Sequence, residues 1–147
     1  MYNLPKFSNG LCAALLSSSS DIAIILEESK RLSKGSDFVL MLRPSKGTEH
    51  KLIPAYIGAM IRQNSGTMRS NSLAIEILLF ISGTMNIGNA IKRAGANGKE
   101  FVIFSNRKKL IEGIISKFKM KKLKAYLLEL DPKASGRIAI TAIKDDK

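Results

Sequence analysis

Few residues in this sequence could carry out catalytic chemistry. Nucleophilic catalysis needs a nucleophile, a base and a group that orients the base. The chain has one cysteine, Cys12, and one histidine, His50. Cys12 lies in an apolar run and His50 precedes a helical pattern, so we do not expect the two side chains to meet. One histidine and one cysteine also cannot supply four zinc ligands. We therefore predict neither catalytic residues nor a metal site.

The carboxylates do not suggest a catalytic pair either. Glu27 and Glu28 are adjacent on an expected helix and cannot face each other, and Asp145 and Asp146 belong to a polar tail. Glu76 stands alone in an apolar segment. An ion pair with a nearby Arg or Lys is favoured over a binding role, because an unpaired buried carboxylate is strongly destabilising. We expect a protein that is not an enzyme, with no cofactor and no small-molecule substrate of its own.

The basic residues are more informative. The chain has 24 Lys and Arg against 12 Asp and Glu, which gives a net charge of +12. Such a surface attracts polyanions, and nucleic acid is the commonest one, although a generally basic background is an open alternative. Arg107, Lys108 and Lys109 are expected in the first turn of a helix capped by Asn106. Cations there oppose the helix dipole, so this turn is either a phosphate receptor or a solvated turn.

Hydrophobic patterning predicts how these residues are positioned. Apolar runs predict strands at Leu11–Leu16, Phe38–Leu42 and Phe101–Phe104. Helical spacing predicts helices from Asp21 to Leu32, from near Lys51 with Pro54 in the first turn, over Ile87–Ala94, and after Asn106. Periodicity leaves Ser72–Ile81, Leu123–Leu130 and the tail after Pro132 open between helix and strand. The fold class predicted is α/β, with residues 1–147 forming a single compact domain and a small mixed sheet covered by several helices.

Composition and termini bear on the compartment. A single cysteine excludes an internal disulfide and fits a reducing environment. Residues 1–10 lack an apolar signal-peptide core, and the run Leu73–Ile81 is interrupted by Glu76 and too short to span a bilayer. We expect a cytoplasmic protein with no membrane partner.

One segment carries a family resemblance. It reads Ser-Leu-Ala-Ile-Glu-Ile-Leu-Leu-Phe-Ile-Ser-Gly over 72–83, followed by Asn86-Ile87, Ala90-Ile91 and Gly95. It resembles the central motif of the kinase-binding subunit of the KEOPS complex, the TPRKB family in its short archaeal-type form. That family has a Ser-Leu-x-x-Glu-Ile-Leu helix, a Ser-Gly turn and a Gln-Ile-x-x-Ala-Ile helix ending in Gly. Asn86 departs from the glutamine, and upstream only Ser70 and Ser72 match the family pattern.

The resemblance implies a helix over 72–81 and a docking function. The subunit would bind the small atypical kinase/ATPase of KEOPS and help recruit tRNA through its 3′ CCA end, while another subunit makes threonylcarbamoyladenosine at adenosine 37. The alternative is a generic basic RNA-binding protein outside KEOPS. The expected RNA contacts, which flank the motif or begin a helix, are Arg69, Lys92, Arg93, Lys108 and Lys109.

The tail is the expected partner-binding segment. Its apolar residues share one face if the segment is helical; they are Ile138, Ala139, Ala142 and Ile143. Burial of these side chains in the domain's own core is the open alternative.

Overall fold

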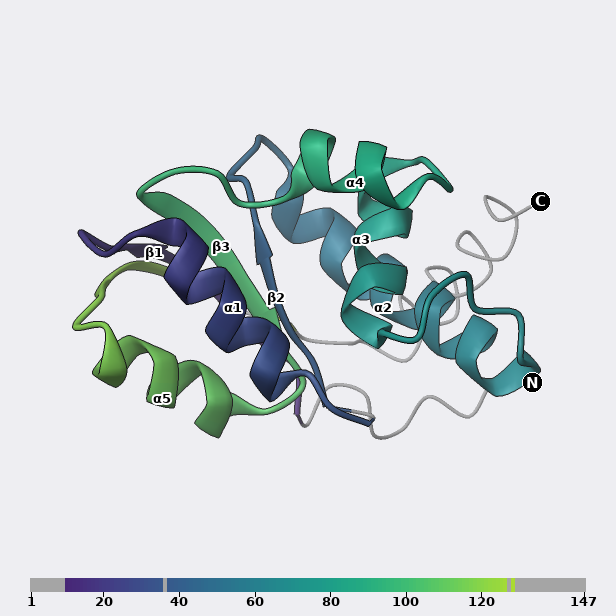
Figure 1. The fold of residues 1–147 in the computed structure, drawn as a ribbon, viewed down its shortest axis with the longest axis horizontal. Helices are drawn as coiled ribbons and strands as arrows, with labels where there is room; N and C mark the ends of the chain where they lie inside the picture. Colours follow the sequence, from purple (N-terminus) through teal and green to yellow (C-terminus); the bar gives the residue numbers. More distant parts are fainter. Residues whose placement is uncertain (1–9, 36, 127, 129–147) are drawn as a thin grey trace.

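The computed structural model describes residues 10–35, 37–126 and 128 (Figure 1). The strands are β1 (Cys12–Ser17), β2 (Val39–Leu42), β3 (Glu100–Ser105) and β4 (Lys121–Tyr126). The helices are α1 (Ile22–Leu32), α2 (Thr48–Ser65), α3 (Leu73–Ser82), α4 (Ile87–Ala94) and α5 (Lys108–Lys117). The three strands predicted from apolar runs are all present, and the α/β class is confirmed.

The four described strands form one sheet in the order β2-β3-β1-β4. All three pairings are antiparallel, so the expectation of a mixed sheet is wrong. The reason lies in α2, α3 and α4, which return the chain to the end of the sheet where β2 stops. An isolated bridge between Leu42 and Gly95 marks that return. Strand β3 must then run back along β2, with Leu42 opposite Val102 and Val39 opposite Ser105.

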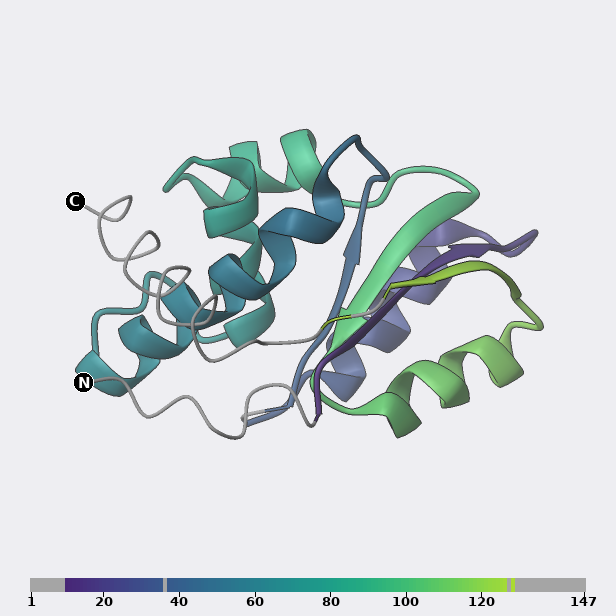
Figure 2. The ribbon, with the colours of Figure 1, turned by 180° about the vertical axis from the view of Figure 1, so that it is seen from behind.

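Helices cover both faces of the sheet, as Figures 1 and 2 show. Because side chains alternate along a strand, Leu40 and Phe104 face α2 and α3, whereas Met41 and Ile103 face α1 and α5. This explains the continuous apolar runs in β2 and β3, since strands buried on both faces do not alternate with polar residues.

Local capping agrees with most sequence expectations. The Asp21 carboxylate accepts the amide of Ala23 at 3.0 Å and begins α1. Helix α3 confirms the helical reading of the central motif; Ser72 caps its start, and Gly83 ends it with φ 74°. The left-handed conformation at Gly83 is open to glycine at little cost.

Two helix starts differ from expectation. Helix α2 begins at Thr48 rather than near Lys51, because the Thr48 hydroxyl donates to the Ser45 carbonyl at 2.8 Å and fixes an earlier turn. Pro54 therefore lies inside the helix, beyond its first turn. Asn106 does not cap α5: its side-chain oxygen accepts the amide of Phe38 at 3.1 Å. Arg107 occupies the cap position instead, without a side-chain capping bond.

The segment left open at 123–130 begins as a strand. Strand β4 lies at the edge of the sheet, and its pairing with β1 shifts register between Leu15 and Leu16. Lys121, Lys122 and Lys124 are exposed on it. Lysines on an edge strand oppose pairing with other chains, which gives this basic run a structural role.

Gly58 permits close packing of α2 on α3. A Cβ atom at Gly58 would lie 2.6 Å from Cζ of Phe80. Gly58→Ala should therefore lower the free energy of unfolding by about 1–3 kcal/mol through overpacking. Gly113→Ala is the control, because Gly113 is exposed in α5 with nothing within 4 Å of the added atom. That change should stabilise by about 0.5–1 kcal/mol in urea denaturation. Equal effects of the two substitutions would contradict the packing role of Gly58.

Candidate nucleic-acid interface

The expected RNA-contacting residues lie in three places. Lys92 and Arg93 are on α4, at the end of the sheet where β2 stops. Lys108 and Lys109 begin α5 just after β3 and lie at the opposite end, since β2 and β3 are antiparallel. Arg69 follows the C-terminal end of α2. This helix of 18 residues begins beside the end of β2 and spans about 27 Å, so Arg69 lies far from Lys92 and Arg93. The structure thus brings together only Lys92 and Arg93 among the five.

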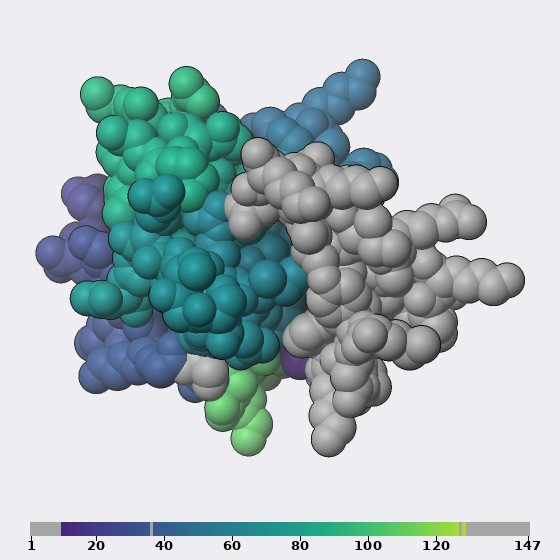
Figure 3. Space-filling view, turned by 90° about the vertical axis from the view of Figure 1, so that its right-hand side faces the viewer, coloured from purple at the N-terminus to yellow at the C-terminus, as the bar shows by residue number. Residues whose placement is uncertain are grey.

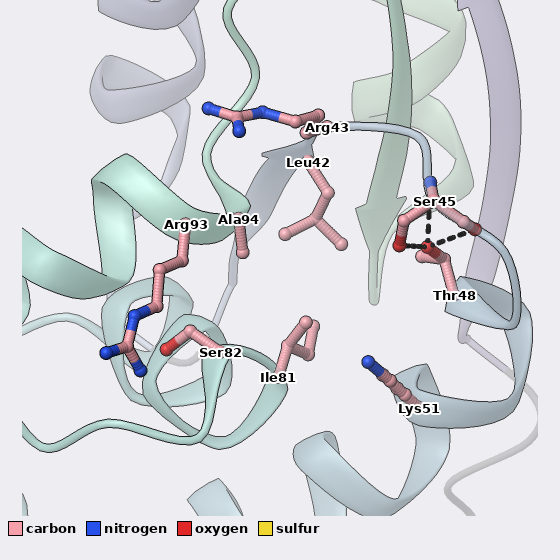
Figure 4. Close-up of a pocket in the computed structure, with 9 residues that line it drawn as sticks. All are labelled: Leu42, Arg43, Ser45, Thr48, Lys51, Ile81, Ser82, Arg93 and Ala94. Carbon is pink, nitrogen blue, oxygen red and sulfur yellow. Dashed lines mark hydrogen bonds between the residues drawn. The ribbon is translucent and has the colours of Figure 1, made fainter.

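A cavity of about 160 Å³ lies beside Arg93. Its wall comes from the end of β2, the turn into α2, the end of α3 and the end of α4 (Figure 4). The lining residues are Leu42, Arg43, Ser45, Thr48, Lys51, Ile81, Ser82, Arg93 and Ala94.

The polar lining of this cavity is cationic. Arg43, Lys51 and Arg93 supply positive charge, three further residues supply hydroxyl groups, and none of the described residues in the lining carries a carboxylate. In Figure 4, Lys51 approaches from α2 and Arg93 from α4, with Ile81 and Ser82 between them. A recess lined by one sign of charge focuses the electrostatic field and concentrates counter-ions of the other sign. The geometry therefore suits an anion such as a phosphate group.

Arg43 connects the cavity to α4. Its amide donates to the carbonyl of Ala94 at 2.8 Å, and its Nη2 donates to the carbonyl of Lys92 at 2.8 Å. These bonds satisfy carbonyl groups at the end of the helix. Its Nε is buried and has no partner among the described residues. Arg43 thus holds the end of α4, and with it Arg93, against the end of β2.

The turn into α2 is held by a short hydroxyl network. The Ser45 and Thr48 hydroxyl oxygens lie 2.7 Å apart, and the Ser45 amide donates to Thr48 Oγ1 at 3.2 Å (Figure 4). Lys51 follows in the first turn of α2. The helix N-terminus is electropositive, so the ammonium group of Lys51 adds to a field that already favours anions.

Glu76 forms the ion pair expected for it. The fully buried carboxylate lies 3.7 Å from Nη1 of Arg62. It also accepts the amides of Arg69 and Ser70 and the Ser70 hydroxyl, each at 3.0 Å. Glu76 therefore fixes the connection between α2 and α3, which contains Arg69. Figure 3 shows the side of the molecule on which α2, α3 and α4 lie.

The residues considered for catalysis lie in separate settings. Cys12 is in β1, where its thiol lies 3.6 Å from the carbonyl of Ser105, and burial raises the pKa of that thiol. A raised pKa disfavours the reactive thiolate. His50 is exposed near the start of α2, 3.7 Å from Glu49. Within residues 10–35, 37–126 and 128, no three His, Cys, Asp or Glu side chains form a metal-binding group.

No single helix in the described part of the chain is long and apolar enough to cross a bilayer. Helices α3 and α4 together pass that test by length and composition only, and they are bent by 69° relative to each other. Much of α3 is buried in the core.

Sequence reasoning missed Arg43 and Lys51. They follow a buried strand and begin a helix, positions that meet in space only once β2 and α2 are placed. The expected partner-binding residues Ile138, Ala139, Ala142 and Ile143 lie outside the described residues.

A comparison with protein-family models places most of the chain in a known family. The family model described as kinase binding protein CGI-121 matches residues 27–127. That range contains the whole cavity lining and helices α2 to α5. No curated protein sequence matches the chain.

Proposed function

Because the chain belongs to the CGI-121 family of kinase-binding proteins, we propose that it is a non-catalytic subunit of a cytoplasmic KEOPS complex. In this proposal it binds the small atypical kinase/ATPase subunit and helps recruit tRNA through the 3′ CCA end. Another subunit then carries out threonylcarbamoylation of adenosine 37. The single observation that supports the RNA part is the cavity lined by Arg43, Lys51 and Arg93, in which the described part of the chain places no carboxylate.

The cavity suits a phosphate of the RNA backbone. Phosphate contacts made by Lys and Arg supply most of the affinity of such interfaces, because each one releases condensed counter-ions. Lys51 and Arg93 come from different helices and lie on either side of Ile81 and Ser82 in Figure 4, so the two cations could contact different phosphates of one strand. Lys92 is exposed on α4 next to Arg93 and is placed for a further phosphate along the strand.

The remaining expected contacts lie farther away. Lys108 and Lys109 at the other end of the sheet, and Arg69 after α2, cannot share the phosphate held in the cavity. Their role in the proposal is long-range attraction of the polyanion, which adds to the net charge of +12.

Two binding measurements test this function with the purified chain. The logarithm of its affinity for tRNA should fall linearly with the logarithm of the salt concentration. The slope should be about −0.7 to −0.9 for each phosphate contacted. The affinity should also fall when the 3′ CCA is removed from the tRNA. Binding of the separately purified kinase/ATPase subunit should be measurable in the same buffer. Equal affinity for intact and CCA-less tRNA, with no binding of the kinase subunit, would instead support a generic RNA-binding protein. Robust ATP hydrolysis by the chain alone would contradict a non-catalytic role.

A further inference from the structure

Ser45 places an exposed hydroxyl group on the wall of the basic cavity. Three hydroxyl side chains line that cavity, but they differ in accessibility. Thr48 is only 2% exposed, and the hydroxyl of Ser82 donates to the carbonyl of Leu79 at 3.2 Å. Ser45 is exposed and lies outside any helix or strand, in the connection between β2 and α2. Of the three, Ser45 is therefore the hydroxyl that another protein can reach.

The connection that carries Ser45 keeps its shape without the proton of the Ser45 hydroxyl. Pro44 restricts the backbone before Ser45, and Gly47 has φ 82°, a left-handed conformation that suits glycine. The Thr48 hydroxyl donates to the Ser45 carbonyl at 2.8 Å, and the Ser45 amide donates to Thr48 Oγ1 at 3.2 Å. A group attached to the Ser45 oxygen would leave both of these bonds in place.

The surroundings of Ser45 suit a phosphate group attached to its oxygen. Arg43, Lys51 and Arg93 line the same cavity, and none of the described lining residues is acidic. In Figure 4, the ammonium group of Lys51 lies below the hydroxyl groups of Ser45 and Thr48. Ser45 also lies just before α2, at the electropositive end of that helix. A phosphoserine carries a charge of about −1.5 to −2 and three acceptor oxygens, and nearby cations and a helix N-terminus stabilise it.

We propose that Ser45 is a phosphorylation site, and that its phosphate closes the basic cavity to RNA. The inference rests on the proposed function, because it takes the bound kinase/ATPase subunit as the enzyme and RNA as the ligand that is displaced. The Ser45 oxygen forms a bond to the γ-phosphorus of ATP, and the bond from that phosphorus to the β-phosphate oxygen breaks. ADP leaves with the electron pair, and the hydroxyl proton is released to solvent.

The phosphate on Ser45 acts through its charge and its position. It competes with RNA for the cations of the cavity, Lys51 above all, and it repels the phosphates of the strand. Because it is covalently attached, its effective concentration at these cations is high, and RNA in solution does not readily displace it. Phosphorylation thus releases RNA from the cavity without a change of fold.

Phosphate transfer is tested by incubating the chain with the separately purified kinase/ATPase subunit, Mg²⁺ and ATP. Mass spectrometry of the digested chain should locate a phosphate on Ser45, and Ser45→Ala should remove that phosphate. Phosphate on other residues only, or no phosphate on the chain, overturns the proposal. If the unmodified chain binds neither the kinase subunit nor tRNA, the proposed function itself fails. Binding of both without phosphate on Ser45 rejects this inference alone.

The effect on RNA is tested with a chain that carries phosphoserine at position 45. Its affinity for tRNA should be at least tenfold lower at moderate salt, and its salt slope should be smaller by about one for each lost phosphate contact. Ser45→Glu, with a single charge, should give a smaller loss. Ser65→Glu is the matched control, since Ser65 is exposed at the far end of α2, and its affinity should stay within about twofold of the unmodified chain. Equal affinity of the phosphorylated and unmodified chains overturns the proposal, and so do equal losses for the two glutamate variants.

Discussion

Replacing Lys51 and Arg93 together by glutamine is expected to weaken tRNA binding by about tenfold or more at moderate salt. Both side chains line the basic cavity, and no carboxylate among the described lining residues offsets their charge. If each contacts phosphate, the double variant should also reduce the salt slope of log affinity by about one per lost contact. Titration of labelled tRNA at several salt concentrations measures both quantities. Arg43 is left in place because its guanidinium and amide hold the end of α4.

The control removes the same charge elsewhere. Lys108→Gln with Lys109→Gln lowers the net charge equally, at the end of the sheet away from the cavity. This variant should weaken binding much less, and the salt slope should stay close to that of the unmodified chain. Equal losses for the two double variants would mean that total charge, and not the cavity, governs affinity. Glutamine is used in both double variants in place of an acidic residue, because an added carboxylate would itself repel the RNA phosphates.

The sequence predicts the sheet better than it predicts the site. Apolar runs identify β1, β2 and β3 because both faces of these strands are buried. Periodicity cannot separate helix from strand for α3, since most of that helix is buried and apolar residues occur all round it. The order of Ser72, Glu76 and Gly83 in the motif is what identifies it as a helix. Each of these residues has a local task, as cap, ion pair or helix end.

The cavity has no equivalent signature in the sequence. Its cations come from the end of β2, the start of α2 and the end of α4, and Arg43 and Arg93 are 50 positions apart in the sequence. Charge patterning favoured Lys108 and Lys109 because they are adjacent to each other at a helix start. Their distance from Arg93 depends on the direction of β3, which the expectation of a mixed sheet left undetermined. The exposure of Ile87 and Ile91 could not be predicted either, because their spacing is that of a helical stripe facing the core although both are exposed.

Loss of the Glu76 carboxylate is expected to be the most destabilising single change among those considered. Glu76→Leu removes the carboxylate that lies 3.7 Å from Nη1 of the buried Arg62, and it leaves the amides of Arg69 and Ser70 without this acceptor. Removal of one partner from a buried ion pair typically costs about 3–5 kcal/mol of unfolding free energy. Urea denaturation followed by circular dichroism measures this loss.

Two companion variants separate charge from hydrogen bonding at Glu76. Glu76→Gln keeps one acceptor oxygen of similar shape but no charge, so its loss should be smaller than that of Glu76→Leu. Arg62→Met removes the cation that lies 3.7 Å from the carboxylate and 4.6 Å from the centre of the Phe80 ring. In the double variant of Glu76→Leu and Arg62→Met, the combined loss should be smaller than the sum of the single losses, since both single losses include the same interaction between the two side chains. Strict additivity would show that the two side chains do not interact, and Glu76 would then act through its hydrogen bonds to the amides of Arg69 and Ser70 and to the Ser70 hydroxyl.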